Sequence, residues 1–171
     1  MIRINRNYRL LVILFPLVYI AHNLEEGIVF SSKYQLIQTK IPDFIKSIFA
    51  LGDATKSFWI ALIFASILPI VFSVYLYQSE SQTRIKVLLF ITVLTTVNII
   101  SHITSSIFLG FASPGLITAI LICIPYTILV YLYCYKHHGI RAKHYIPIII
   151  LSIPIFILII ALSWLFGIAI A

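Results

Sequence analysis

A histidine and two glutamates lie inside an otherwise apolar stretch near the start of the chain. His22, Glu25 and Glu26 are preceded by the apolar run 10–21 and followed by the run 27–30. On an α-helix they stand at positions i, i+3 and i+4, so all three side chains project from one side, within reach of a shared ligand. A carboxylate in the hydrocarbon core costs about 2.5–3.5 kcal/mol, and two adjacent carboxylates also repel each other. The cluster therefore requires a partner: a metal ion, protons, another cation or a polar side chain.

A structural interpretation of the same three residues is the alternative. At the outer membrane interface, Glu25 and Glu26 would be solvated charges at a helix end, with His22 as a neighbour reaching toward water. A second polar pair further along the chain favours the intramembrane interpretation.

The composition is that of a polytopic membrane protein. The chain has 171 residues, of which 61% are hydrophobic and 10% charged, and its mean hydropathy is +1.09. Soluble globular domains are far less apolar. The net charge of +7 comes from Lys and Arg in the short gaps between apolar runs, which is typical of membrane topology and not of nucleic-acid binding. We expect a single integral membrane domain, 1–171, located in the cell membrane.

The apolar runs predict an all-α bundle of transmembrane helices. Each run is close to the ~20 residues that a bilayer requires, and five spans are expected, at residues 10–30, 57–77, 85–108, 116–135 and 145–170. The first span carries no evident cleavage site, so we expect it to be retained. Between the first two spans, segment 31–56 has apolar residues at helical spacing and predicts an interfacial amphipathic helix across the mouth of the bundle, with a plain connecting loop as the alternative.

The basic residues predict the orientation. One side of the predicted bundle carries Arg3, Arg6, Arg9, Arg84, Lys86, Lys136, Arg141 and Lys143, and the other carries Lys33, Lys40, Lys46 and Lys56. By the positive-inside rule the N-terminus is cytoplasmic and the C-terminus outside.

The third span contains the second polar pair, at a matching depth. Asn98 and His102 stand at i and i+4, on one helix face. His22 lies 13 residues beyond Arg9 and His102 lies 16 beyond Lys86, which places both about 20–24 Å from the cytoplasmic ends, in the outer half of the membrane. The break 113–115 and Thr118 open the fourth span from that same side, and the start of a helix offers free N–H groups to an anion or a carbonyl.

Other polar residues have a structural interpretation. Asn98 by itself is typical of an interhelical hydrogen bond. His137, His138 and His144 resemble a metal-binding tract, but their basic neighbours favour a solvated loop, and we leave them out of the site. Cys123 and Cys134 are about 16 Å apart along one helix, too far to form a disulfide.

Three motifs in this order resemble those of the HXXEE-domain integral membrane proteins. They are the segments 22–26 (HNLEE), 98–102 (NIISH) and 113–118 (SPGLIT), and the resemblance extends from the first to the fourth predicted span. It implies a bacterial membrane protein, hence one of the cytoplasmic membrane, whose His, Glu and Asn residues form the functional site. It does not imply a particular activity.

A metal-dependent intramembrane hydrolase is the first hypothesis. His-x-x-Glu-Glu differs by one residue from the inverted zinc-protease motif His-x-x-Glu-His. By that analogy His22, Glu26 and His102 are ligands of a divalent metal, Glu25 is the general base, and Asn98 orients the substrate or supports His102. Zinc fits two nitrogens and one carboxylate, and manganese or iron is the alternative. The substrate would be a lipid or a peptide that enters from the bilayer.

A non-enzymatic role is the second hypothesis. Glu25 and Glu26 would then share protons or a cation, as in proton or ion coupling or a small transporter, or the protein would be an immunity-type interaction partner. Five spans are few for a transporter, and a homo-oligomer would supply the missing surface. Metal-independent acid–base chemistry at His22 is the alternative within the enzyme class. The sequence has no phosphate loop, dinucleotide fingerprint or CxxC pair, so nucleotide-driven chemistry is not expected.

Overall fold

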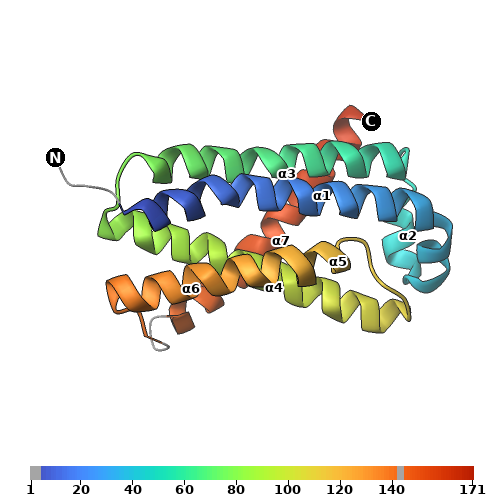
Figure 1. The fold of residues 1–171 in the computed structure, drawn as a ribbon. Coiled ribbons are helices and arrows are strands. Elements are labelled where there is room, and N and C mark those ends of the chain that lie inside the picture. Colours follow the sequence, from blue (N-terminus) through green and yellow to red (C-terminus); the bar gives the residue numbers. More distant parts are fainter. Residues whose placement is uncertain (1–4, 142–144) are drawn as a thin grey trace.

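The computed structural model describes residues 5–141 and 145–171, and these contain no strand. Five helices in this part of the chain are long and apolar enough to cross a membrane: α1 (Arg6–Lys40), α3 (Ala54–Tyr77), α4 (Gln82–Leu109), the helical segment Leu116–His138, and α7 (Tyr145–Ile170). Figure 1 shows them as one elongated bundle. The predicted all-α bundle of five spans is therefore confirmed. Its orientation in the membrane stays a prediction, and Arg3, Lys143 and His144, which the sequence analysis used, lie outside the described residues.

The first helix is longer than predicted. It continues ten residues past the expected boundary at 30 and ends at Lys40, because a helix satisfies its own backbone hydrogen bonds whether its side chains meet lipid or water. It stops where Ile41 precedes Pro42, since the residue before a proline disfavours helical geometry. The amphipathic helix predicted within 31–56 is consequently short, confined to α2 (Asp43–Phe49).

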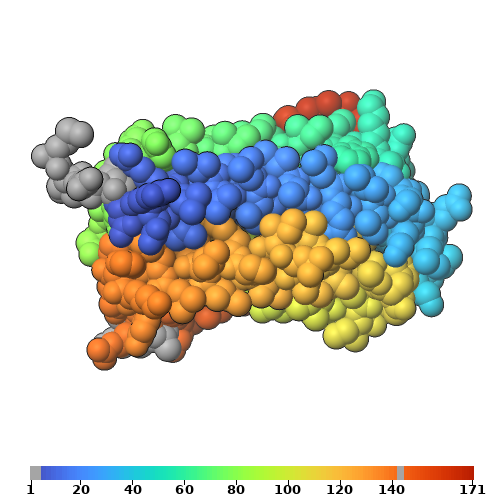
Figure 2. Space-filling model, in the orientation of Figure 1, coloured from blue at the N-terminus to red at the C-terminus, as the bar shows by residue number. Residues whose placement is uncertain are grey.

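One apolar stripe on α1 faces the interior of the bundle. Tyr8, Phe15, Val18 and His22 recur at helical spacing and are all buried. The stripe lets α1 pack against α3 and against the segment that follows α4, and on the face seen in Figure 2 α1 and α6 (Ile124–His138) lie in contact along the bundle. His22 is thus carried to the interior by the same periodicity that buries the apolar residues before it.

Helices α3 and α4 are splayed apart from each other. α3 and α4 are joined by a short turn, yet they touch at few positions, and α7 packs across both of them. α4 is the most buried of the five long helices. This arrangement surrounds a space between α1, α3, α4 and α7.

A short loop after α4 returns the chain toward the interior. Gly110, with φ of +77°, ends α4, and the Ser113 hydroxyl then donates to the His102 carbonyl over 2.8 Å. Gly115, with φ of +83°, begins α5 (Leu116–Thr118). The π-helical turn η1 (Ala119–Cys123) follows and leads into α6. The fourth span therefore starts where predicted, but it contains a π-helical turn that the sequence did not indicate.

Candidate functional site

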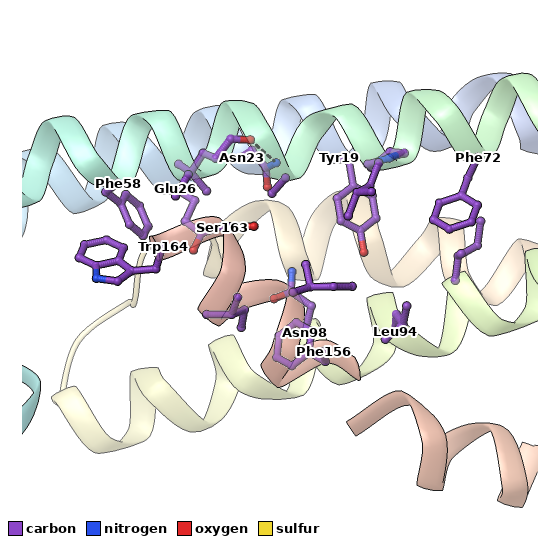
Figure 3. A pocket seen from close by; sticks show the side chains of 18 of the residues that line it. Tyr19, Asn23, Glu26, Phe58, Phe72, Leu94, Asn98, Phe156, Ser163 and Trp164 are labelled. Atoms are coloured by element: carbon purple, nitrogen blue, oxygen red, sulfur yellow. Dashed lines mark hydrogen bonds between the residues drawn. The ribbon is translucent and has the colours of Figure 1, made fainter. Parts of the chain in front are cut away.

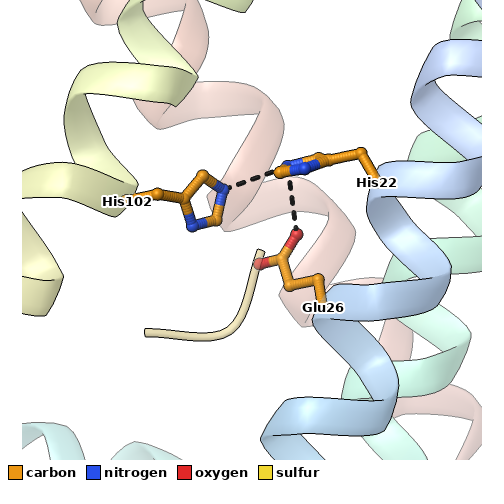
Figure 4. Close-up of side chains that lie close together, drawn as sticks. All are labelled: His22, Glu26 and His102. Atoms are coloured by element: carbon orange, nitrogen blue, oxygen red, sulfur yellow. Dashed lines mark hydrogen bonds and ion pairs between the residues drawn. The ribbon is translucent and has the colours of Figure 1, made fainter. Parts of the chain in front are cut away.

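Three side chains from two helices meet inside the bundle. His22 and Glu26 come from α1 and His102 comes from α4, and Figure 4 shows them pointing toward one another. His22 is 1% exposed and His102 is 7% exposed, while the Glu26 side chain is 19% exposed. We call these three residues the His cluster. The prediction that His22 and His102 share one depth is confirmed by their direct contact.

The distances within the His cluster suit a common ligand. The Nε2 atoms of His22 and His102 are 3.1 Å apart, and Glu26 Oε2 lies 3.8 Å from His22 Nε2. One ligand atom from each residue falls within 4.8 Å of the other two. The Asn98 amide also reaches this point, with Nδ2 3.0 Å from His22 Nε2.

The hydrogen bonds around His22 define its tautomer. The Thr118 hydroxyl donates to Glu25 Oε2 over 2.6 Å, so its single proton is used. The same hydroxyl oxygen is 2.9 Å from His22 Nδ1 and must accept there, which places the ring proton on Nδ1. The lone pair of His22 is therefore on Nε2, directed into the His cluster.

His102 lies directly against His22. A hydrogen bond joins the Nε2 atoms of the two rings over 3.1 Å, and the Asn98 amide donates to His22 Nε2 over 3.0 Å. Histidines that bind metals usually donate their other N–H to an outer acceptor, as His22 Nδ1 does to the Thr118 hydroxyl.

Glu25 is held by the start of the fourth span. Its Oε2 accepts from the Thr118 N–H over 2.9 Å and from the Thr118 hydroxyl. Of the three motif residues, His22 and Glu26 lie in the group that could hold a metal ion, and Glu25 lies outside that group. The other oxygen, Oε1, is buried and has no hydrogen-bond partner among the described residues.

Gly115 fits between the two imidazole rings. A Cβ built on it would lie 2.6 Å from Cε1 of His102 and 2.9 Å from Cε1 of His22, closer than carbon atoms can approach. Its φ of +83° is also one that other residues adopt only with strain. Both requirements limit this position to glycine.

A cavity of about 380 Å³ adjoins the His cluster. Figure 3 shows it between α1, α3, α4 and α7, and Ile48 and Phe49 of α2 also contribute to its wall. Glu26 and Asn98 line it, so the cavity and the His cluster share these two side chains. Asn23, which donates to the Ser66 hydroxyl of α3 over 2.8 Å, forms part of the same wall.

The structure brings together most of the residues predicted from the sequence and adds others. His22, Glu26, His102 and Asn98 converge, and Glu25 lies beside them through Thr118. The sequence analysis noted Thr118 and Gly115 as the opening of a helix and did not assign them to the site. The sequence feature that marks these two residues is the close spacing of serine, glycine and threonine in 113–118. This spacing predicts the start of a helix but not the side chains that the helix start contacts.

A second polar cluster lies at the opposite end of the bundle. Glu80, between α3 and α4, accepts hydrogen bonds from the Tyr133 hydroxyl and from the Asn5 N–H at 2.9 Å, and His138 Nε2 is 3.1 Å from its carboxylate. We call these four residues the Glu80 cluster. His138 is therefore part of α6 and 13% exposed, so its prediction as a solvated loop residue was wrong. Cys123 and Cys134 are buried and free, as expected.

Hydrogen bonding determines the ionisation of Glu80. Burial acts to raise the pKa of its carboxyl, but the hydrogen bonds from Tyr133, from the Asn5 N–H and from His138 outweigh burial, and the pKa lies below its ordinary value.

Comparison with known proteins agrees with the motif. No curated protein and no solved structure matches the chain. One family model matches residues 13–130, a range that holds the His cluster together with Asn98, Gly115 and Thr118 but ends before α7. The chain therefore belongs to the family described as proteins of unknown function with an HXXEE motif.

Proposed function

We propose that His22, Glu26 and His102 bind a divalent metal ion and that the protein is a metal-dependent hydrolase within the membrane. The observation that carries the proposal is the convergence of two buried imidazole rings and one carboxylate, whose donor atoms lie within 4.8 Å of one another. The ring of His22 is also held from outside, because its Nδ1 bonds the Thr118 hydroxyl over 2.9 Å.

The donor set fits zinc best. Zinc takes nitrogen and carboxylate ligands at about 2.0–2.2 Å, and donor atoms at such distances lie about 3.4 Å apart around a tetrahedral ion. Two of the three separations, 3.1 Å between the two nitrogens and 3.8 Å from His22 to Glu26, bracket that value, and all three donor atoms lie within 4.8 Å of one another. Two nitrogens and one oxygen leave a fourth position for water or substrate, and the carboxylate keeps manganese and iron as alternatives.

The other residues of the site have roles that follow from their contacts. A metal ion held by His22, Glu26 and His102 would polarise a carbonyl and lower the pKa of bound water to about 7. Glu25 is anchored through Oε2, and its unpartnered Oε1 is the proposed general base. Asn98, at the wall of the cavity, donates its amide N–H to the substrate carbonyl. Hydrolysis adds water across an ester or amide bond and releases an acid and an alcohol or amine.

Elemental analysis of the detergent-purified protein tests the metal site. We expect stoichiometric metal in the wild type and its loss in the His22→Ala, His102→Ala and Glu26→Ala variants. The matched control is His137→Ala, because His137 is an exposed histidine at the other end of the bundle. Full occupancy in both cluster histidine variants contradicts the proposal, as does a wild type that binds no metal when zinc, manganese and iron are supplied.

Proton coupling is the second candidate function. The hydrogen bond of 3.1 Å between the two Nε2 atoms would carry a proton from one ring to the other without a metal. In that case the purified protein would be free of metal, and proton exchange across reconstituted vesicles would depend on His22 and His102. In both candidates we place the protein in the bacterial cytoplasmic membrane with its N-terminus inside, so that the His cluster is in the outer half of the bilayer.

A further inference from the structure

We propose that the cavity beside the His cluster binds a single hydrocarbon chain headed by an uncharged carbonyl group, as in a fatty acyl ester or amide, with the carbonyl at Asn98 and Glu26. The position of the carbonyl rests on the proposed hydrolase site. Occupation of the cavity by the chain does not require metal or activity and is measured separately.

The shape of the cavity selects a narrow ligand. Its lining extends along α1 from Phe15 to Glu26 and along α3 from Phe58 to Phe72, about 16 Å and 21 Å at 1.5 Å per residue. Its volume is only about 380 Å³, toward the lower end for ligand pockets. The cavity is therefore long for its volume, which suits an extended chain.

The polar residues of the lining are gathered in one part of the cavity. Figure 3 shows Glu26, Asn23, Ser163 and Asn98 near one another, with Phe58 and Trp164 on one side of them and Phe72 and Leu94 on the other. A molecule with one polar group and a hydrocarbon chain matches this lining. The hydrocarbon end would extend away from the His cluster toward Phe72.

The charges of the lining restrict the head group. The described residues that line the cavity include no Lys or Arg, so no side chain there pairs with a phosphate. Glu26 disfavours a carboxylate in the same place. The Asn98 amide and the Ser163 hydroxyl instead provide donors for a carbonyl, and the Ser163 oxygen is buried without a hydrogen-bond partner among the described residues. A neutral acyl ester or amide meets all of these conditions.

Photo-crosslinking locates the chain. The probe is a primary fatty amide with a diazirine in the middle of the chain, incorporated with the protein into phosphatidylcholine vesicles. We expect labelling of Phe72 and its cavity neighbours in preference to Ile70 and Val71, which precede Phe72 on the same helix and are exposed on its outer face. Labelling concentrated on the two exposed residues overturns the inference.

A cavity-filling variant provides the second test. Ala65 lines the cavity, and Ala65→Phe should reduce labelling of Phe72 by roughly tenfold or more, because the added ring takes the space of the chain. The matched control Ala169→Phe places the same side chain on an exposed part of α7 and should leave labelling unchanged. Equal labelling in the Ala65→Phe variant, with metal content and folding intact, contradicts the proposal.

The two proposals fail in different ways. Ala65→Phe should lose the cross-link and keep the metal, whereas His22→Ala should lose the metal and keep the cross-link. Metal without cavity labelling in the wild type refutes the acyl-chain site alone. Cavity labelling without metal refutes the metal site alone.

Discussion

The His cluster and the Glu80 cluster both bury polar groups between helices, but they differ in how completely those groups are paired. At Glu80, both carboxylate oxygens accept hydrogen bonds, from Tyr133 and His138 at one and from Asn5 at the other. Beside the His cluster, Glu25 Oε1 is buried and has no hydrogen-bond partner among the described residues. Complete pairing stabilises a fold, whereas incomplete pairing costs free energy that the fold must offset elsewhere.

This difference predicts which cluster serves which purpose. Side chains kept in an unfavourable arrangement by outer hydrogen bonds are typical of binding sites, because the ligand completes the pairing. The Glu80 cluster joins the start of α1, the turn before α4 and the end of α6, and it requires no ligand. We therefore expect substitutions at the first cluster to change ligand binding, and substitutions at the second to change stability.

The largest effect is expected for Gly115→Ala. The added Cβ would collide with both imidazole rings, and we expect metal binding to be lost. Gly110→Ala is the matched control, because Gly110 also has a positive φ, +77°, but nothing lies within 4 Å of the added Cβ. Both variants should lose about 1–2 kcal/mol of stability from backbone strain, but only Gly115→Ala should lose metal in elemental analysis. Equal metal content in the two variants would remove the argument for Gly115.

A smaller effect is expected for Thr118→Val. The substitution preserves the branched shape but removes the hydroxyl that bonds both Glu25 and His22. Loss of such an outer contact lowers metal affinity by about 10–100-fold, which competition with a chelator measures. Thr127→Val is the control, since that hydroxyl bonds only the Ile124 carbonyl of its own helix. An unchanged affinity in Thr118→Val would mean that the tautomer of His22 is fixed in another way.

The smallest effect on the site is expected for Glu80→Gln. One amide nitrogen replaces an accepting oxygen, so a donor among Tyr133, His138 and Asn5 loses its acceptor, at a cost of about 1–3 kcal/mol. Thermal unfolding in detergent should show this loss, while metal content stays at the wild-type level. Asp43→Asn, at an exposed acidic residue, is the control and should unfold like the wild type. A loss of metal in Glu80→Gln would break the division between the two clusters.

The pH dependence of stability provides a further check on the same variant. Because the pKa of folded Glu80 is below the ordinary value of 4.5, its stabilising contribution is complete above pH 4.5 and is lost as the pH falls through the folded pKa. The wild type should therefore approach the Glu80→Gln variant in stability as the pH falls below 4.5. Tyr133 and His138 face the same carboxylate, and both remain in the variant. A constant difference across this range would contradict the assignment.

The fold was predictable to different degrees along the chain. The last span, 145–170, has the bounds of α7 as predicted, because a long run without charges has no alternative in a bilayer. The end of α1 was not predictable, since Ser31 and Lys33 indicate where a helix leaves the hydrocarbon and not where its hydrogen bonding stops. The segment 31–40 was accordingly assigned to the connection, although it continues α1.

The site was predictable in depth but not in rotation. Counting residues from the basic ends was sufficient to place His22 level with His102. It could not show that Glu25 would turn toward Thr118, because neighbouring residues on a helix point about 100° apart and the choice depends on what α5 presents. The role of Gly115 depends on a contact between segments 13 or more residues apart in sequence, with His102 and His22, and helix periodicity carries no information about such contacts.

The π-helical turn after α5 sets a limit on changes in chain length. A π turn holds one more residue than an α turn, and here it lies between Thr118, which contacts His22, and Tyr126, whose hydroxyl donates to the Leu11 carbonyl over 3.1 Å. Because the wider turn takes up this extra residue, deleting one residue within 119–123 would let the turn close into regular α-helix and keep both contacts in register, whereas a second deletion would rotate one contact relative to the other by about 100°. Members of the family that lack one residue in this turn should therefore keep the threonine and the cluster histidines, and only a gap of two residues should accompany their loss.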